Sequence, residues 1–161
     1  STSHDDSGIL STHLHSEGAY AKELWVEAPS SGVTPRLNQE ILDEGRHFLQ
    51  MNGREVFRHA VTRFPQVIME GLDANGLAPE DIDLLVPHQA NIRIAQMIQK
   101  RLKLRDDQVY SNIHKYGNTT AASIPIALCE AMDEGRVKKG DLVVFAAFGS
   151  GFTWASAIVK W

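Results

Sequence analysis

The sequence predicts an α/β fold: a five-stranded, mostly parallel sheet covered by helices, with the elements in the order βαβαβαββ. Segments with the apolar spacing of helices alternate along the chain with short apolar runs typical of buried strands. The last two runs, 142–148 and 152–159, are separated only by Gly149-Ser150-Gly151, a pattern that indicates a turn between antiparallel strands. The final strand is therefore expected to run against the others.

Each predicted strand is short and bounded by turn-forming residues. The first alternates apolar with polar or His side chains, the second is closed by Pro87, the third is the weakest, and the fourth is a continuous apolar run typical of a central strand. The five strands are expected at 9–15, 82–86, 109–113, 142–148 and 152–159.

Three helices are expected between these strands. The first begins near Asn52, which with Glu55 resembles a capping box, and runs to about Asn75, with a kink or a junction expected at Pro65. The second has its buried face at Ile94, Ile98 and Leu102, and the third covers 121–132. The irregular stretch 20–49 is an unusually long connection, of a kind that is often functional.

Composition is that of an ordinary globular domain, and one domain is expected over residues 1–161. The chain is 43% hydrophobic and 22% charged, and its formal net charge of -4 gives no reason to expect nucleic-acid binding. We expect no membrane span, and the start of the chain, 1–8, lacks the basic and apolar regions of a signal peptide, which favours a cytoplasmic protein.

Cys129 is the single cysteine, so one copy of the chain cannot form an internal disulfide. We expect Cys129 to be a small buried residue.

Three loops should meet at the edge of the sheet where parallel strands end, which is where α/β folds bind ligands. They contain His88 in VPHQAN, Asn118 in YGNTTAAS and Ser150 in AFGSGFTWASA. Each also has an ordinary interpretation: a locally satisfied histidine, turn chemistry after Gly117, and a hairpin turn between two strands. Their occurrence together, in this order and spacing, favours a functional site.

These loops and the segment 51–57 resemble the 3-oxoacyl-[acyl-carrier-protein] synthase III (ketoacyl synthase III) family from residue 9 to the end of the chain. The resemblance implies a thiolase-like fold of two similar halves. This chain would be the C-terminal half, and the missing N-terminal half would carry the cysteine nucleophile. The implied reaction is a decarboxylative Claisen condensation of an acyl-CoA primer with malonyl-[acyl-carrier-protein], which starts fatty acid biosynthesis.

The resemblance also implies site residues. His88 and Asn118 would donate hydrogen bonds to the enolate oxygen formed by decarboxylation, and the backbone N–H of Ser150 would complete an oxyanion hole. The family more often has glycine at this last position, but a main-chain role tolerates serine. Residues implied at the pantetheine arm or its tunnel are Gly53, Asn91, Met51 and Phe57. No metal or cofactor is implied, because the coenzyme A thioester and the phosphopantetheine-linked malonyl group are substrates.

A basic helix suggests a partner surface. Between Gln89 and Arg105 there are five basic residues and no acidic one, which on residue pattern alone favours a solvated helix whose late cations offset the helix dipole. The resemblance implies docking of the acidic acyl carrier protein instead. The candidate docking residues are Arg58, Arg93, Lys100 and Arg101. The resemblance further implies that the complete enzyme is a homodimer.

Other interpretations remain open at this level. His13 and His15 lie two apart on a predicted strand, a spacing that can ligate a metal, but no obvious third ligand is nearby. The chain could also be a module that binds carrier protein or coenzyme A thioesters without turnover. A related condensing enzyme of secondary metabolism is a third possibility, although the GFGPG pattern of chalcone-type synthases is missing from the terminal loop.

Overall fold

The computed structural model describes residues 7–161. The prediction that the start of the chain, 1–8, has no signal-peptide features therefore lies mostly outside the described residues. The strands are β1 (Gly8–Ser16), β2 (Leu24–Trp25), β3 (Gln50–Met51), β4 (Leu84–Pro87), β5 (Leu142–Gly149) and β6 (Thr153–Lys160). The α-helices are α1 (Gln39–Asp43), α2 (Gly53–Ala74), α3 (Ile92–Leu102), α4 (Ile113–Tyr116) and α5 (Ser123–Asp133), with short 3-10 turns at Gly18–Glu23, Pro79–Asp81, Asp106–Gln108 and Thr120–Ala122.

The main sheet of the described region has four strands in the order β1-β6-β5-β4. β4 and β5 are parallel, whereas β6 is antiparallel to both of its neighbours. Consequently β1, β4 and β5 run in one direction and β6 alone runs in the other, as predicted for the last strand. The predicted hairpin between β5 and β6 is also confirmed, with Gly149 paired to Thr153.

The fifth predicted strand, 109–113, is reduced to one parallel bridge between Val109 and Leu85. The Tyr110 N–H donates to the Leu85 carbonyl at 2.9 Å, but beyond this point the backbone turns to the side chain of Gln89, which accepts from the Asn112 N–H at 3.1 Å. Because a side chain replaces the next strand as hydrogen-bond partner, the ladder stops and α4 begins. The predicted strand count was one too high for this reason.

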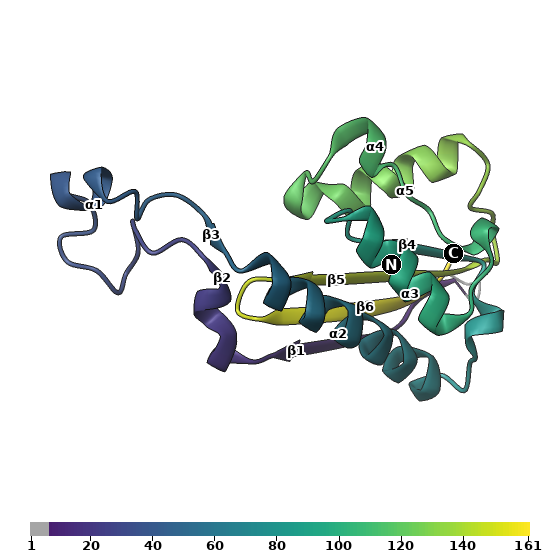
Figure 1. The fold of residues 1–161 in the computed structure, drawn as a ribbon. Coiled ribbons are helices and arrows are strands. Elements are labelled where there is room, and N and C mark those ends of the chain that lie inside the picture. The colour runs from purple at the N-terminus through teal and green to yellow at the C-terminus, as the bar shows by residue number, and fades with distance from the viewer. Residues whose placement is uncertain (1–6) are drawn as a thin grey trace.

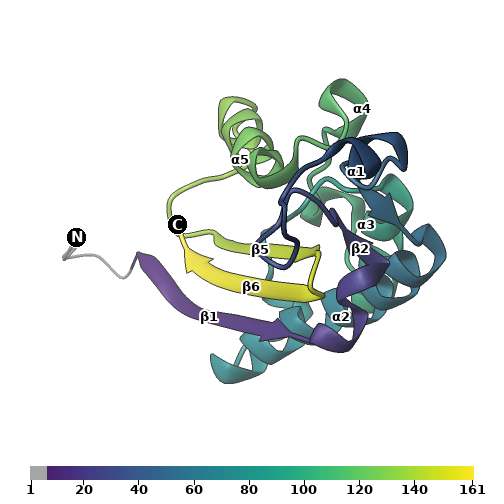
Figure 2. The ribbon, with the colours of Figure 1, turned by 90° about the vertical axis from the view of Figure 1, so that its left-hand side faces the viewer.

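Helices cover both faces of the sheet (Figures 1 and 2). Leu85 and Val144 pack in one apolar cluster with α2 and α3, while the adjacent Leu84 and Val143 pack in a second cluster with Ala127 of α5. Successive strand residues point to opposite faces, so β4 and β5 are buried on both sides, as their continuous apolar sequence predicts.

The first long helix is one continuous element. The side chain of Asn52 accepts from the Glu55 N–H at 3.4 Å and caps α2 as predicted, although the Glu55 carboxylate bonds Arg58 rather than completing the box. Pro65 lies inside α2 and is buried, and the helix continues across it, so the predicted junction between two segments is wrong. Its buried face, which includes Phe64 and Ile68, packs on the sheet.

The long connection predicted at 20–49 forms an arm that projects from the body of the molecule (Figure 1). β2 and β3 pair with each other as a two-stranded sheet, and α1 lies between them in sequence. Several apolar side chains of the arm are exposed, among them Phe48 at 63% and Leu49 at 64%. The arm therefore presents apolar surface beside the start of α2.

Candidate active site

The first site loop follows β4 and is held against β5. The His88 N–H donates to the Ala146 carbonyl of β5 at 2.8 Å, which continues the parallel pairing of Pro87 with Ala146. The His88 side chain is half-buried, and its Nδ1 lies 2.5 Å from the hydroxyl of Ser123 at the start of α5. Burial lowers the pKa of the His88 imidazole below its ordinary value. The ring is therefore neutral near pH 7.

The second loop places Asn118 after α4. Gly117, with φ +68°, ends that helix in a conformation that favours glycine. The Asn118 side chain is exposed, and its Oδ1 accepts from the Thr120 N–H at 2.9 Å. With the amide oxygen engaged in this way, the Nδ2–H group is the part of the side chain that can donate to a ligand.

The third loop joins β5 to β6. Ser150 is exposed, and its carbonyl accepts from the Thr153 hydroxyl at 2.9 Å. Gly151 has φ +132°, and a Cβ atom there would lie 2.8 Å from Cγ2 of Thr153. Glycine at this position therefore lets the chain turn directly beside Ser150.

One cavity of about 1220 Å³ brings the predicted site together. Every residue predicted to act in catalysis, in the oxyanion hole or at the pantetheine arm lines it: His88, Asn118, Ser150, Gly53, Asn91, Met51 and Phe57. Apolar side chains from the arm, α2, β5 and β6 contribute to the remaining wall, as in a site that holds an extended acyl or pantetheine chain. Met51 is 60% exposed, so the cavity is open on the side of the arm.

Asn91 has a structural role besides its position in the cavity. It is the N-cap of α3, where its Oδ1 accepts from the Arg93 N–H at 2.9 Å. This bond fixes the start of α3 against the loop that carries His88.

Gln89 is a site residue that the sequence prediction missed. Its side chain is 4% exposed, and all of its polar capacity is used. Nε2 donates to the carbonyls of Pro87 and Tyr110, while Oε1 accepts from the Ser111 hydroxyl and the Asn112 N–H. Gln89 therefore ties the His88 loop to the segment that leads to Asn118. The sequence signal was its place in VPHQAN beside His88.

Glu130 of α5 is a second missed residue. Its carboxylate accepts from the Tyr116 hydroxyl at 2.7 Å, from Asn112 Nδ2 at 2.7 Å and from Lys115 Nζ at 3.2 Å. The hydrogen bonds from Tyr116 and Asn112 are the main cause that lowers the pKa of Glu130 to about 2. Through Glu130, α5 therefore anchors the short helix α4, which immediately precedes Asn118. The local sequence does not reveal this tertiary contact.

All four candidate docking residues are exposed: Arg58, Arg93, Lys100 and Arg101. Arg58 is engaged within its own helix, because its Nε donates to the Glu55 carboxylate at 3.1 Å. Arg93 is in the first turn of α3, two residues after the cavity-lining Asn91, whereas Lys100 and Arg101 lie in the last turn of the helix. The structure thus separates Arg93 from the other two by most of the helix.

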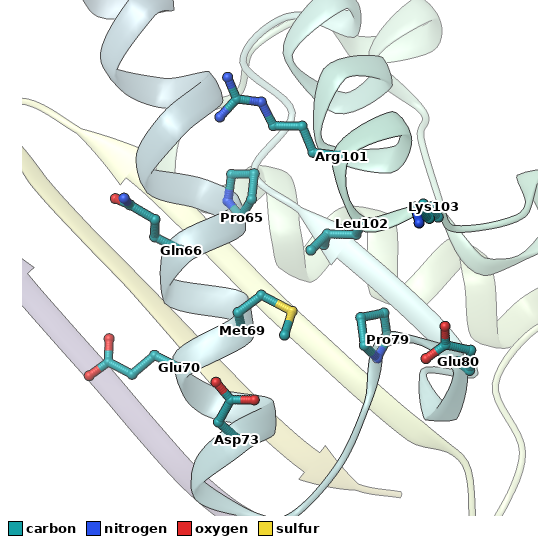
Figure 3. A pocket seen from close by; sticks show the side chains of 10 residues that line it. All are labelled: Pro65, Gln66, Met69, Glu70, Asp73, Pro79, Glu80, Arg101, Leu102 and Lys103. Atoms are coloured by element: carbon teal, nitrogen blue, oxygen red, sulfur yellow. The ribbon is translucent and has the colours of Figure 1, made fainter.

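Arg101 borders a different hollow, of about 880 Å³, between α2 and the end of α3 (Figure 3). Glu70 and Asp73 of α2 lie on one side of this hollow, and Lys103 follows Arg101 on the other. It shares none of the residues that line the cavity of His88. Its opposite charges are spread around an apolar floor rather than converging on one point.

Cys129 is exposed, so the prediction of a buried cysteine is wrong. α5 turns Ser123, Ala127 and Ala131 toward the sheet, and Cys129 lies off that face. It is also outside the set of residues that line the cavity.

His13 and His15 both contact one carboxylate. Glu70 Oε1 lies 3.3 Å from His13 Nδ1, and Glu70 Oε2 lies 2.6 Å from His15 Nε2, so the pair joins β1 to α2. Residues 7–161 contain no group of three or more His, Cys, Asp or Glu side chains that could hold a metal ion.

Among the helices in this part of the chain, none is both long and apolar enough to cross a membrane.

Known proteins resemble the chain in sequence and in structure. A beta-ketoacyl-[acyl-carrier-protein] synthase III of Rhodospirillum centenum is 48% identical over 157 residues, which cover 97% of this chain and 45% of that protein. One of Caldanaerobacter subterraneus subsp. tengcongensis is 47% identical over 154 residues, covering 96% of this chain and 46% of the relative. The chain spans about half the length of the curated relatives it matches.

Solved structures show the same fold. The beta-ketoacyl-[acyl-carrier-protein] synthase III of Thermus thermophilus superposes with a TM-score of 0.86 at 41% identity, covering 98% of this chain and 47% of that one. The 3-oxoacyl-[acyl-carrier-protein] synthase III of Aquifex aeolicus VF5 gives 0.85 at 38% identity, with 99% and 46% covered. The fold is thus the thiolase-like α/β class that the sequence predicted. Residues 72–161 match the family model of the 3-oxoacyl-[acyl-carrier-protein (ACP)] synthase III C-terminal domain, and the chain belongs to this family.

Proposed function

We propose that this chain is the C-terminal part of a 3-oxoacyl-[acyl-carrier-protein] synthase III that condenses an acyl-CoA primer with malonyl-[acyl-carrier-protein] at the start of fatty acid biosynthesis. The observation that carries the proposal is that His88, Asn118 and the Ser150 loop all line the same cavity. A neutral imidazole and a primary amide are donors that stabilise an oxyanion without giving up a proton. The names of the relatives point to the same reaction.

Decarboxylation is the first step that these donors would assist. The bond between the malonyl carboxylate and the adjacent methylene carbon breaks, CO₂ leaves, and the electron pair moves into the thioester to form an enolate. His88 and Asn118 would donate to the enolate oxygen, whose negative charge is larger in the transition state than in the substrate. Hydrogen bonds that strengthen in this way lower the barrier.

Condensation follows at the acyl carbonyl. The enolate carbon attacks this carbonyl, a carbon–carbon bond forms, and the oxygen of the tetrahedral intermediate would accept from the Ser150 N–H. Collapse of the intermediate expels a thiolate and releases the 3-ketoacyl product on the carrier protein. We propose that this thiolate belongs to a cysteine outside residues 1–161, because Cys129, the one cysteine of the chain, lies away from the cavity.

The partners follow from this reaction. Arg93, two residues after the cavity-lining Asn91, is the leading candidate to dock the acidic carrier protein, with Arg58, Lys100 and Arg101 as further contacts. Gly53 and Asn91 would contact the pantetheine arm, and Met51 and Phe57 would line its tunnel. The complete enzyme would be a cytoplasmic homodimer, and analytical ultracentrifugation of the full-length protein would test its oligomeric state.

The test is a condensation assay with the complete protein, supplied with acyl-CoA and malonyl-[acyl-carrier-protein]. We expect CO₂ and a 3-ketoacyl product, and we expect His88→Ala or Asn118→Ala to lower the rate about 100-fold or more, as for loss of an oxyanion-hole donor. Acyl transfer to the cysteine should change less. Tight binding of carrier protein without any product would instead support a binding module. Near wild-type rates in either variant would remove that residue from the mechanism.

A further inference from the structure

The Ser123 hydroxyl contacts the His88 ring directly. Ser123 is the first residue of α5 and is 2% exposed, and its Oγ lies 2.5 Å from His88 Nδ1. The same oxygen accepts from the Gln89 N–H at 3.2 Å. A buried hydroxyl on the helix thus meets both the proposed donor and the residue that follows it.

The count of protons and lone pairs decides how this contact is arranged. A serine hydroxyl has one proton to donate and two lone pairs that accept. The Gln89 N–H uses one lone pair, and within residues 7–161 the hydrogen bonds of Oγ are those to Gln89 and His88. If Nδ1 carried the ring proton, it would donate to Oγ, and the hydroxyl proton would be buried without an acceptor, which is unfavourable. If Nδ1 is bare, the hydroxyl donates to it and every group is paired.

We propose that Ser123 is a positioning residue that holds His88 in the tautomer protonated at Nε2. The significance of this tautomer rests on the proposed function: with Nδ1 engaged by Ser123, only Nε2–H can donate to an enolate oxygen in the cavity. Because burial lowers the pKa of His88, the ring carries a single proton near pH 7, and the position of that proton decides whether the cavity contains a donor or an acceptor.

Nitrogen-15 NMR of the chain labelled at histidine tests the proposal without any turnover. A protonated and a bare ring nitrogen have well separated chemical shifts, and the signals of His88 among the seven histidines are assigned by their loss in His88→Gln. We expect a bare Nδ1 and a protonated Nε2 in the wild type. Ser123→Ala should raise the Nδ1–H population, and Ser123→Thr, which keeps the hydroxyl, should restore the wild-type pattern.

The matched control is Ser111→Ala, which removes a hydroxyl that bonds Gln89 Oε1 at 3.0 Å without touching His88. This variant should keep the wild-type tautomer. A protonated Nδ1 in the wild type, or an unchanged tautomer in a cooperatively folded Ser123→Ala, would overturn the proposal. If Ser123→Ala does not fold, Ser123→Cys makes the same comparison, because a thiol is a much weaker donor of similar size.

Kinetics of the complete enzyme provide a second readout. Ser123→Ala should lower kcat for malonyl decarboxylation about 10-fold with KM unchanged, less than the roughly 100-fold expected for loss of the donor itself. The two experiments separate this proposal from the proposed function. The Nε2–H tautomer in an enzyme that does not condense would refute the function and leave the role of Ser123, whereas an active enzyme with Nδ1–H would refute the role alone.

Discussion

The side chain of Gln89 accepts a hydrogen bond from the Asn112 N–H at 3.1 Å, and this contact takes the place of the next rung of the sheet. The same side chain donates to the Pro87 carbonyl at 2.7 Å. Because one end of the Gln89 side chain bonds the end of β4 and the other end bonds the segment that leads to Asn118, Gln89 ties the two site loops to each other. The sheet pairing between β4 and the segment that leads to Asn118 thus ends in the contact with Gln89, and this contact is what brings the two loops together.

Replacing Gln89 with Met should destabilise the fold by about 1–3 kcal/mol, because the buried backbone groups that it satisfies lose their partners. Urea unfolding followed by circular dichroism measures this free energy. The control is Gln66→Met on the exposed face of α2, which should change stability by less than about 0.5 kcal/mol. Equal stability of the two variants would show that the Gln89 network does not hold the loops.

Gly71 marks the closest approach of α2 to the sheet. A Cβ atom at Gly71 would lie 2.9 Å from Cδ1 and Cγ1 of the fully buried Ile158. We therefore expect Gly71→Ala to destabilise the chain by about 1–3 kcal/mol through overpacking, although alanine is the better helix former. Ile158→Val should recover part of this loss in the double variant. Gly18→Ala, where a Cβ meets no atom within 4 Å, is the control; a stabilised Gly71→Ala would contradict the packing argument.

The Glu130 carboxylate should make stability depend on pH. Hydrogen bonds from Tyr116 and Asn112 lower the pKa of Glu130 to about 2, against an ordinary value of 4.5. A group whose pKa is lower in the folded state contributes stability that is complete above the unfolded pKa and is lost as the pH falls toward the folded one. The stability difference between wild type and Glu130→Gln should therefore shrink from about pH 5 to pH 2.

Chemical denaturation at a series of pH values measures this difference. The exposed Glu80 provides the control, since Glu80→Gln should run parallel to the wild type. A constant gap between wild type and Glu130→Gln across the acid range would mean that the Glu130 carboxylate does not anchor the turn before Asn118.

The sequence predicted α2, α3 and α5, the strands β1, β4, β5 and β6, and residues that line the cavity, but it gave no sign of β2, β3, α1 or α4. Apolar periodicity reports burial, and the strand ends at Pro87 and Gly149 mark the edge where the loops meet. It could not show the contacts of Ser123 or Glu130, because each depends on how α5 packs against loops that are distant in the sequence. Polar side chains inside an apolar helix give no local sign of their partners.

Cys129 shows why burial was predicted wrongly within α5. Apolar residues occur on several sides of this helix, so periodicity alone does not select the face that meets the sheet. The structure places the small residues Ala127 and Ala131 there, which permits close packing, and leaves Cys129 exposed.

Arg93→Glu should weaken the use of carrier-linked malonyl substrate about 10-fold while sparing a small free thioester, because only the carrier protein depends on the basic surface. The effect should shrink as salt is added. Steady-state kinetics with both substrates measure the difference between the two losses. The control is Lys138→Glu, because Lys138 lies just before β5, at the opposite end of that strand from the cavity. Equal losses for both substrates would place Arg93 in the tunnel or in the fold.

The last prediction concerns the nucleophile. If the acyl group is held by a cysteine outside residues 1–161, the isolated chain should form no ketoacyl product even when folded, because it would stabilise an enolate without an acyl partner. Cys129→Ser in the complete enzyme should then retain wild-type turnover, since Cys129 lies away from the cavity. His88→Ala is the matched variant that should lose activity under the same conditions. Product from the isolated chain, or loss of turnover in Cys129→Ser, would place the nucleophile within this chain and refute its interpretation as one half of the active site.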